Sequence, residues 1–200
     1  MKRGIKYGRL GAGFSMIELL AVAAILLLLF TLYWGSGASE SQLRRVQKDC
    51  QSQLQRLYVS LSIYANEHDG HFPVASNALT PAQGLAVLVP RYTVDTSLFL
   101  CPGVKNAPAQ AELPFREHRI SYAYYMGRRA TDNAVLMSDA QDNPARSAGI
   151  AAFSSTSKAP GNNHGKIGGN FLFCDGRAEA SAPRVPFSLG PTQGIVLLNP

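Results

Sequence analysis

The sequence has few cysteines, and the three it has, Cys50, Cys101 and Cys174, lie far apart. None belongs to a Cys-x-x-Cys pair, which argues against a structural zinc site of the usual kind. In an exported domain, three cysteines favour one disulfide and one leftover thiol. We expect Cys101 in the disulfide because it lies in an irregular segment, and its partner is either Cys50 or Cys174.

Charged residues are also sparse, at 16% of the chain. Of the 19 basic residues, Lys2, Arg3, Lys6 and Arg9 all precede Phe14, which leaves 15 basic against 13 acidic residues in the rest of the chain. The net charge of +6 therefore reflects the first 13 residues. No later stretch combines clustered Lys and Arg with interleaved aromatic side chains, so we expect no nucleic-acid partner.

Motifs of common active sites are missing as well. The sequence contains no Gly-x-Ser-x-Gly and no convincing spacing of Ser, His and Asp. Gly165-Lys166 resembles the end of a phosphate-binding loop, but Pro160 stands where that loop needs its first glycine. Ile167 stands where it needs Ser or Thr. We therefore expect that the protein is not an enzyme.

What the sequence does have is one long apolar run, from Phe14 to Trp34, interrupted by Ser15, Glu18 and Thr31. As a helix, these 21 residues would span roughly 31 Å, which matches the core of a bilayer. A secretory signal peptide would be shorter and would end in an Ala-x-Ala site, which is missing here. We expect a transmembrane helix over 14–36, with the N-terminus cytoplasmic because basic residues precede it.

Glu18 does not fit a plain membrane anchor. A carboxylate inside a membrane helix costs about 2.5–3.5 kcal/mol on insertion scales, so such a residue usually has a partner. The segment Gly13-Phe14-Ser15-Met16-Ile17-Glu18-Leu19-Leu20 resembles the processing site of type IV prepilins and type II secretion pseudopilins. This resemblance implies that residues 1–13 are a leader, that a prepilin peptidase cleaves after Gly13, and that the new amine of Phe14 is methylated. It also implies that Glu18 pairs with that amine in a neighbouring subunit.

A second helical pattern follows Gly35 and Gly37, which predict a soft break in the helix. We expect an amphipathic helix over 37–68, ended by Asp69-Gly70. Its apolar residues recur at every third or fourth position and form one stripe, which we expect to pack on the domain's own sheet. The stripe consists of Leu43, Val46, Cys50, Leu54, Leu57, Leu61 and Ala65.

Residues 69–200 are predicted to form an exported β-rich domain. Asp175-Gly176 is a strong hairpin signal. One helix followed by several strands indicates an α+β fold, in which the long N-terminal helix packs on a small antiparallel sheet, as in pilins. We expect a short helix over 83–89, a long loop over 147–169, and strands over 120–126, 134–137, 170–174, 177–180 and 195–198.

Two groups of polar residues are candidate sites. Asp139, Asp142 and Asn143 offer oxygen ligands within one loop, which suits calcium, although no EF-hand spacing is present and a simple turn is the alternative. His164 would form a metal or catalytic site if the fold brought it to Asp139 and Asp175. We favour instead that Asp175 serves the hairpin turn and that His164 bonds loop backbone.

Two further segments extend the resemblance. The helix exit at 64–73 resembles that of major pseudopilins, which use a calcium-stabilised loop. His164 and Asp175-Gly176 resemble a C-terminal H-x9-DG pattern that accompanies prepilin-type leaders, with a spacer one residue longer. The resemblance implies a subunit of a type II secretion pseudopilus or type IV pilus-like filament, with prepilin peptidase, other subunits and the inner membrane as partners and a periplasmic domain. The alternative is a membrane-anchored exported binding protein or enzyme with a prepilin-like start.

Overall fold

The structure of the protein is a computed structural model in which the chain divides into two compact units, Met1–Ser39 and Glu40–Pro200. Gly13, Phe14 and Asn143 lie outside the described residues, as do the side chains of 32–39. The structure describes residues 15–104, 112–142, 151–187, 189 and 194–200.

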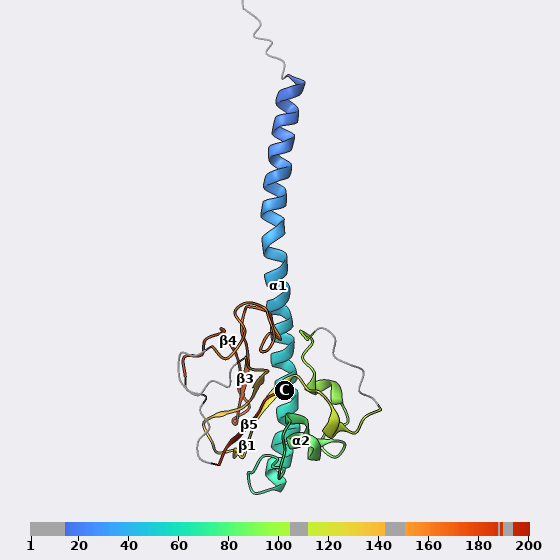
Figure 1. Ribbon diagram of the computed structural model, residues 1–200, viewed down its shortest axis with the longest axis vertical. Coiled ribbons are helices and arrows are strands. Elements are labelled where there is room, and N and C mark those ends of the chain that lie inside the picture. Colours follow the sequence, from blue (N-terminus) through green and yellow to red (C-terminus); the bar gives the residue numbers. More distant parts are fainter. Residues whose placement is uncertain (1–14, 105–111, 143–150, 188, 190–193) are drawn as a thin grey trace, which may run out of the picture. The chain divides into compact units, whose positions relative to one another are not determined.

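The longest element is helix α1, Met16–Glu67 (Figure 1). It is continuous through Gly35 and Gly37, so the predicted break at these glycines is wrong. A glycine costs a helix about 1 kcal/mol relative to alanine, but unlike proline it keeps its backbone N–H, and the hydrogen-bond ladder can continue. Asp69 and Gly70 have φ angles of 52° and 78°, and the Gly70 amide donates to the Ala65 carbonyl, which ends the helix near the predicted position.

Part of the predicted transmembrane segment, 14–36, lies outside the described residues. Within the part of the chain that the structure describes, no helix is long and apolar enough to cross a membrane.

The second unit contains a five-stranded sheet in which all neighbouring strands are antiparallel. The strand order is β4-β3-β2-β1-β5, and all five predicted strands are confirmed to within two residues. The α+β fold class is therefore confirmed. The strands are β1 Tyr122–Met126, β2 Val135–Asp139, β3 Gly169–Phe173, β4 Ala178–Ser181 and β5 Val196–Leu198.

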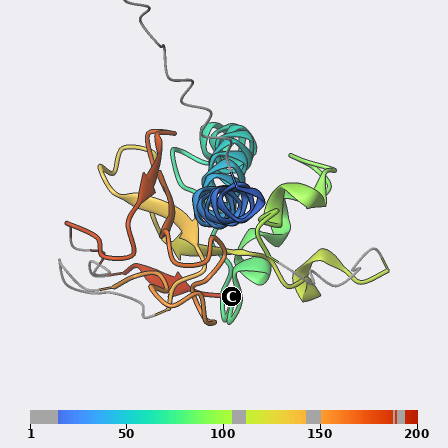
Figure 2. The ribbon, with the colours of Figure 1, turned by 90° about the horizontal axis from the view of Figure 1, so that it is seen from above.

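One face of the sheet packs against the second part of α1. The predicted stripe is confirmed, since Cys50, Leu54, Leu57 and Leu61 are fully buried and belong to one core cluster with side chains of β1, β2 and β3. Polar contacts hold the same surfaces together. Gln47 and Gln51 of the helix donate to backbone carbonyls of Gly169 and Ala178, and Figure 2 shows the helix end-on beside the strands.

The other face of the sheet is covered by the loop before β3 and by the segment after β4. Tyr125, Phe171 and Phe173 point to this side and pack with Phe153 and Val185. Because both faces are covered, β1, β2 and β3 are buried along their whole length. The strands therefore read as apolar runs more than as strict alternations.

Short helical segments complete the second unit. The predicted helix over 83–89 corresponds to α2, Pro81–Leu85, followed by the 3-10 turn η1, Ala86–Leu88. Thr80 caps α2, since its hydroxyl oxygen accepts from the Gln83 amide. Two further 3-10 turns are η2, Thr96–Phe99, and η3, Phe115–Glu117.

Candidate functional site

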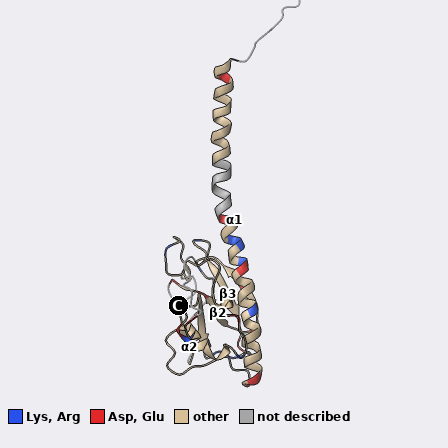
Figure 3. Ribbon diagram, turned by 90° about the vertical axis from the view of Figure 1, so that its right-hand side faces the viewer, with Lys and Arg blue, Asp and Glu red and all other residues tan. Residues whose placement is uncertain are grey.

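The first unit presents an apolar helical surface. The large apolar side chains between Met16 and Phe30 are all more than half exposed. Since successive residues of a helix are about 100° apart, these side chains surround the axis and do not form one stripe. Glu18 is the only charged residue between Ser15 and Ser39, and Figure 3 shows the described first part of α1 in tan below its first turn.

Glu18 lies in the first turn of α1, and its side chain is exposed. Its carboxylate accepts a long hydrogen bond of 3.4 Å from the Ser15 amide. The position at a helix N-terminus favours a negative charge, because the first backbone N–H groups carry partial positive charge. Both features stabilise the ionised carboxylate at this position.

A second candidate lies inside the second unit, where four side chains from separate segments meet. Cys50 belongs to α1, Cys101 follows η2, Asp139 ends β2 and His164 lies in the loop before β3. All four are buried, and their ligand atoms lie within 4.8 Å of one another. We call these four residues the Cys/Asp/His cluster.

Asp139 is the acceptor at the centre of the cluster. Its Oδ1 atom accepts from the Asn163 side chain at 3.0 Å, and its Oδ2 atom accepts from the Asn170 backbone amide at 2.6 Å. Nε2 of His164 lies 3.0 Å from the same Oδ2 atom. A buried carboxylate needs such donors, because it has lost its hydration shell.

His164 therefore does not behave as we expected. Its Nε2 atom faces the Asp139 carboxylate, the Cys101 sulfur at 3.7 Å and the Asn170 side chain at 3.4 Å, and not loop backbone. The interpretation of Asp175 is confirmed, since its carboxylate accepts from the Arg177 amide in the β3–β4 turn and it is exposed. The structure thus brings together two of the three residues of the site that we considered.

The cysteines form one disulfide, Cys50–Cys101, with Cα atoms 5.4 Å apart, and Cys174 is free and buried. This agrees with the expectation of one bridge that includes Cys101. Burial, followed by the negative charge of Asp132, raises the pKa of the Cys174 thiol to about 12. At neutral pH this thiol stays protonated.

Two of the residues predicted to bind calcium, Asp139 and Asp142, have different surroundings in the structure. Asp139 is buried and its carboxylate is engaged inside the sheet, whereas Asp142 is exposed and donates its backbone amide to Ala152. Asn143 lies outside the described residues. The calcium site stays a prediction.

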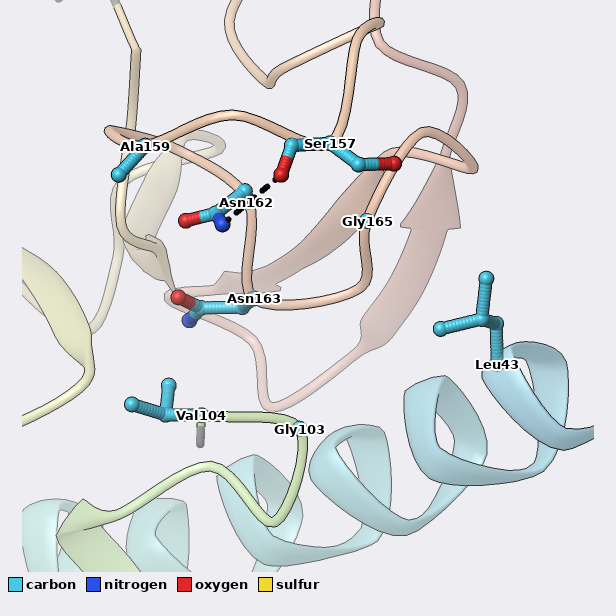
Figure 4. A pocket seen from close by; sticks show the side chains of 8 residues that line it. All are labelled: Leu43, Gly103, Val104, Ser157, Ala159, Asn162, Asn163 and Gly165. Carbon is cyan, nitrogen blue, oxygen red and sulfur yellow. Dashed lines mark hydrogen bonds between the residues drawn. The ribbon is translucent and has the colours of Figure 1, made fainter. Parts of the chain in front are cut away.

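A pocket of about 560 Å³ opens next to the Cys/Asp/His cluster. It lies between the start of the second unit's helix at Leu43, the loop at Gly103 and the loop 157–165 (Figure 4). Two of its lining residues, Asn163 and Gly165, are the chain neighbours of His164. The cluster therefore lies close to a hollow although its own side chains are buried.

The cluster as a whole could not be read from sequence spacing. Cys50 and Cys101 are 51 residues apart, and Asp139 and His164 are 25 apart. The one available signal was the juxtaposition of His164 with Asp139, which we considered without the cysteines. No family model matches the chain, and neither a curated protein nor a solved structure matches it.

Proposed function

We propose that the protein is a structural subunit of a pilus-like filament, of the type II secretion pseudopilus or type IV pilus class. The observation that carries the proposal is helix α1, in which an apolar, exposed first part continues without a break into a second part that is fixed in a folded domain. This is the arrangement that a subunit needs if it polymerises through one half of a helix and displays a domain on the other half.

The exposed apolar part of α1 needs a partner. Eleven side chains between Met16 and Phe30 are more than half exposed, and burying one such side chain contributes about 1.5–3 kcal/mol. A helix that is apolar all round is stable only inside a core or in lipid. The first parts of neighbouring subunits would bury one another in a filament, and the inner membrane would hold residues 14–36 before assembly.

Glu18 supports this proposal over a simple anchor. After cleavage at Gly13, the amine of Phe14 would be a cation among apolar helices. The carboxylate of Glu18 from an adjacent subunit would neutralise it, and removing one member of a buried pair costs about 3–5 kcal/mol. A membrane anchor that only tethers a binding domain or an enzyme gains nothing from this carboxylate.

The test is the variant Glu18→Ala, with Glu40→Ala as the matched control. Glu40 is also an exposed glutamate of α1, and its ion pair with Arg44 at 2.7 Å lies on the surface, where such pairs contribute little. We expect that Glu18→Ala is inserted and cleaved but does not polymerise, whereas Glu40→Ala assembles like the wild type. Filaments are measured by shearing, sedimentation and electron microscopy.

Processing is measured on the same samples by N-terminal sequencing and mass spectrometry. The mature chain should begin at Phe14, with a methylated amine, in the wild type and in both variants. A chain that begins after Trp34 would indicate ordinary signal-peptide cleavage and would contradict the proposal. Normal filaments from Glu18→Ala would contradict the pairing role and would favour the membrane-anchored alternative.

A further inference from the structure

We propose that the Cys/Asp/His cluster is a zinc site in the dithiol form of the protein, and that the Cys50–Cys101 disulfide is its oxidised, metal-free form. The proposal is independent of filament assembly. It rests on the placement of the four side chains, on the hydrogen bonds around them and on the pocket beside them.

The donor set is the first argument. Two thiolates, one imidazole and one carboxylate are the ligand types that Zn²⁺ binds in proteins, usually four at a time. Zinc bond lengths of about 2.0–2.3 Å in a tetrahedron place ligand atoms roughly 3.3–3.8 Å from one another. Nε2 of His164 lies 3.0 Å from Oδ2 of Asp139 and 3.7 Å from Sγ of Cys101, and all four ligand atoms fall within 4.8 Å. Small side-chain shifts suffice to surround one ion.

The surroundings fit a metal ligand set as well. The Asn163 side chain donates to Oδ1 of Asp139 at 3.0 Å, so the carboxylate is oriented with Oδ2 toward the cluster. Asn163 is itself fixed, because the same amide also donates to the Ser121 carbonyl. Groups outside the ligand shell that orient a ligand in this way typically change metal affinity by about 10–100-fold.

The oxidation state decides which form exists. A dithiol reductant transfers two electrons to the Cys50–Cys101 bridge and becomes a disulfide itself, while the protein gains two thiols. Zn²⁺ then replaces the two thiol protons, which are released to solvent, and Nε2 of His164 binds as a lone-pair donor with its proton on Nδ1. A disulfide oxidant accepts two electrons from the two thiolates and takes up two protons to become a dithiol, which restores the bridge and releases Zn²⁺.

The pocket marks the side from which an ion would enter. Two of its lining residues, Gly103 and Asn163 (Figure 4), contact the cluster, since the Gly103 amide donates to Sγ of Cys101 at 3.3 Å and the Asn163 side chain donates to Oδ1 of Asp139. A buried four-ligand site needs such a path for the metal. The two forms would also have the same mechanical role, because either a bridge or an ion joins α1 to the segment after η2.

The experiment uses the full-length protein in detergent. It is reduced with tris(carboxyethyl)phosphine, which becomes its oxide and adds no competing thiol, and is then titrated with Zn²⁺ against a chromophoric chelator without oxygen. We expect one tightly bound zinc per reduced chain and none per oxidised chain. With Co²⁺ as the probe, the reduced protein should show sulfur-to-cobalt charge-transfer bands and the visible bands of a tetrahedral ion.

Variants identify the ligands. His164→Asn and Asp139→Asn keep both cysteines, so each can be purified in the disulfide form and its fold checked by circular dichroism before reduction. Each should bind zinc at least about tenfold more weakly. Cys174→Ala is the matched control, because it removes the cysteine outside the cluster, and it should bind one zinc like the wild type.

Several results would overturn the proposal. The reduced wild type could take up no stoichiometric zinc, its Co²⁺ spectrum could lack the sulfur bands, or Cys174→Ala could lose the ion. If reduction alone unfolds the domain, near-UV circular dichroism shows whether zinc restores the native fold. Recovery of the native signal on adding Zn²⁺ supports the site, and no recovery contradicts it.

Discussion

At the scale of single residues, the Cys174 thiol is protected by its surroundings. Burial and the charges of Asp132 and Asp175 raise its pKa from 9.0 to about 12. Because the thiolate is the reactive form, a shift of this size leaves on the order of a thousandfold less thiolate at pH 8. We expect iodoacetamide to label Cys174 far more slowly in the native protein than in urea, as followed by mass spectrometry without a reductant.

The same shift predicts a pH dependence. The unfolded chain loses the Cys174 proton near pH 9, whereas the folded protein keeps it to about pH 12. The contribution of this group to stability is therefore complete below pH 9 and is lost as the pH rises toward 12. In the iodoacetamide experiment, a labelling rate of Cys174 that is as fast in the native protein as in urea would contradict the burial of the thiol.

Gly176 is a position where a single methyl group should matter. It has a φ of +87°, and an added Cβ would lie 2.5 Å from the Tyr58 ring. Gly70 has a similar φ of +78° with nothing within 4 Å, so Gly70→Ala is the matched control. We expect Gly70→Ala to lower the free energy of unfolding by about 1–2 kcal/mol through backbone strain. Gly176→Ala should lose a further ~1–3 kcal/mol through overpacking.

Urea denaturation of both glycine variants measures this difference. The Tyr58 hydroxyl donates to the Cys174 carbonyl at 2.9 Å, so displacing the ring also removes a hydrogen bond between α1 and the sheet. Equal losses in the two variants would mean that the ring moves aside at no cost.

At the scale of elements, we expect that the second part of α1 is held to the sheet by its buried apolar face alone, and that its exposed face contributes little to stability. Leu54 is fully buried, whereas Val59, five residues further along and on another face of the helix, is 56% exposed. Leu54→Ala should lower the free energy of unfolding by about 2–5 kcal/mol, the usual cost of a buried leucine. Val59→Ala should change it by less than about 0.5 kcal/mol.

Thermal and urea unfolding of these two variants test the packing of the stripe. A similar, small effect of both would mean that the stripe does not anchor the helix to the sheet. In that case its side chains would serve contacts between subunits.

Most elements of the second unit could be predicted from the sequence. Strand positions such as 122–126 and 169–173 were predictable because aromatic and apolar residues gather there and Asp175-Gly176 marks the turn between β3 and β4. The helix stripe was predictable because its spacing repeats every three or four residues. The continuity of α1 through Gly35 could not be predicted. A glycine costs a helix little free energy, and the local sequence does not decide whether a long helix tolerates a glycine.

The Cys/Asp/His cluster was beyond reach for a different reason. Its members come from a helix, two loops and a strand end, and their proximity follows only from the register of β2 against β3 and from the docking of α1. The pairing of Cys101 with Cys50 and not with Cys174 is set by the same docking. Tertiary contacts of this kind leave no local pattern.

At the scale of the whole molecule, the two units should separate cleanly. Among the residues that the structure describes, the core of the second unit uses none before Glu40, and the exposed large apolar side chains of the first unit lie between Met16 and Phe30. We expect residues 40–200 to be a soluble monomer by light scattering, with a cooperative thermal transition. The full-length chain without detergent is the control and should self-associate. A fragment that aggregates would contradict the assignment of the stripe to the domain's own core.

The position of the disulfide also determines how the second unit responds to tension. If Glu40 and Pro200 are pulled apart, the chain can straighten up to Cys50 and beyond Cys101, but the segment between them is bypassed. That segment spans 51 positions, and at about 3.3–3.6 Å per extended residue it would otherwise supply roughly 170–180 Å of length. The bypassed segment holds Leu54, Leu57 and Leu61, so the main helical core stays out of the load path. Under tension the force therefore acts on the sheet, whose strands all follow Cys101, while the segment between Cys50 and Cys101 keeps its length.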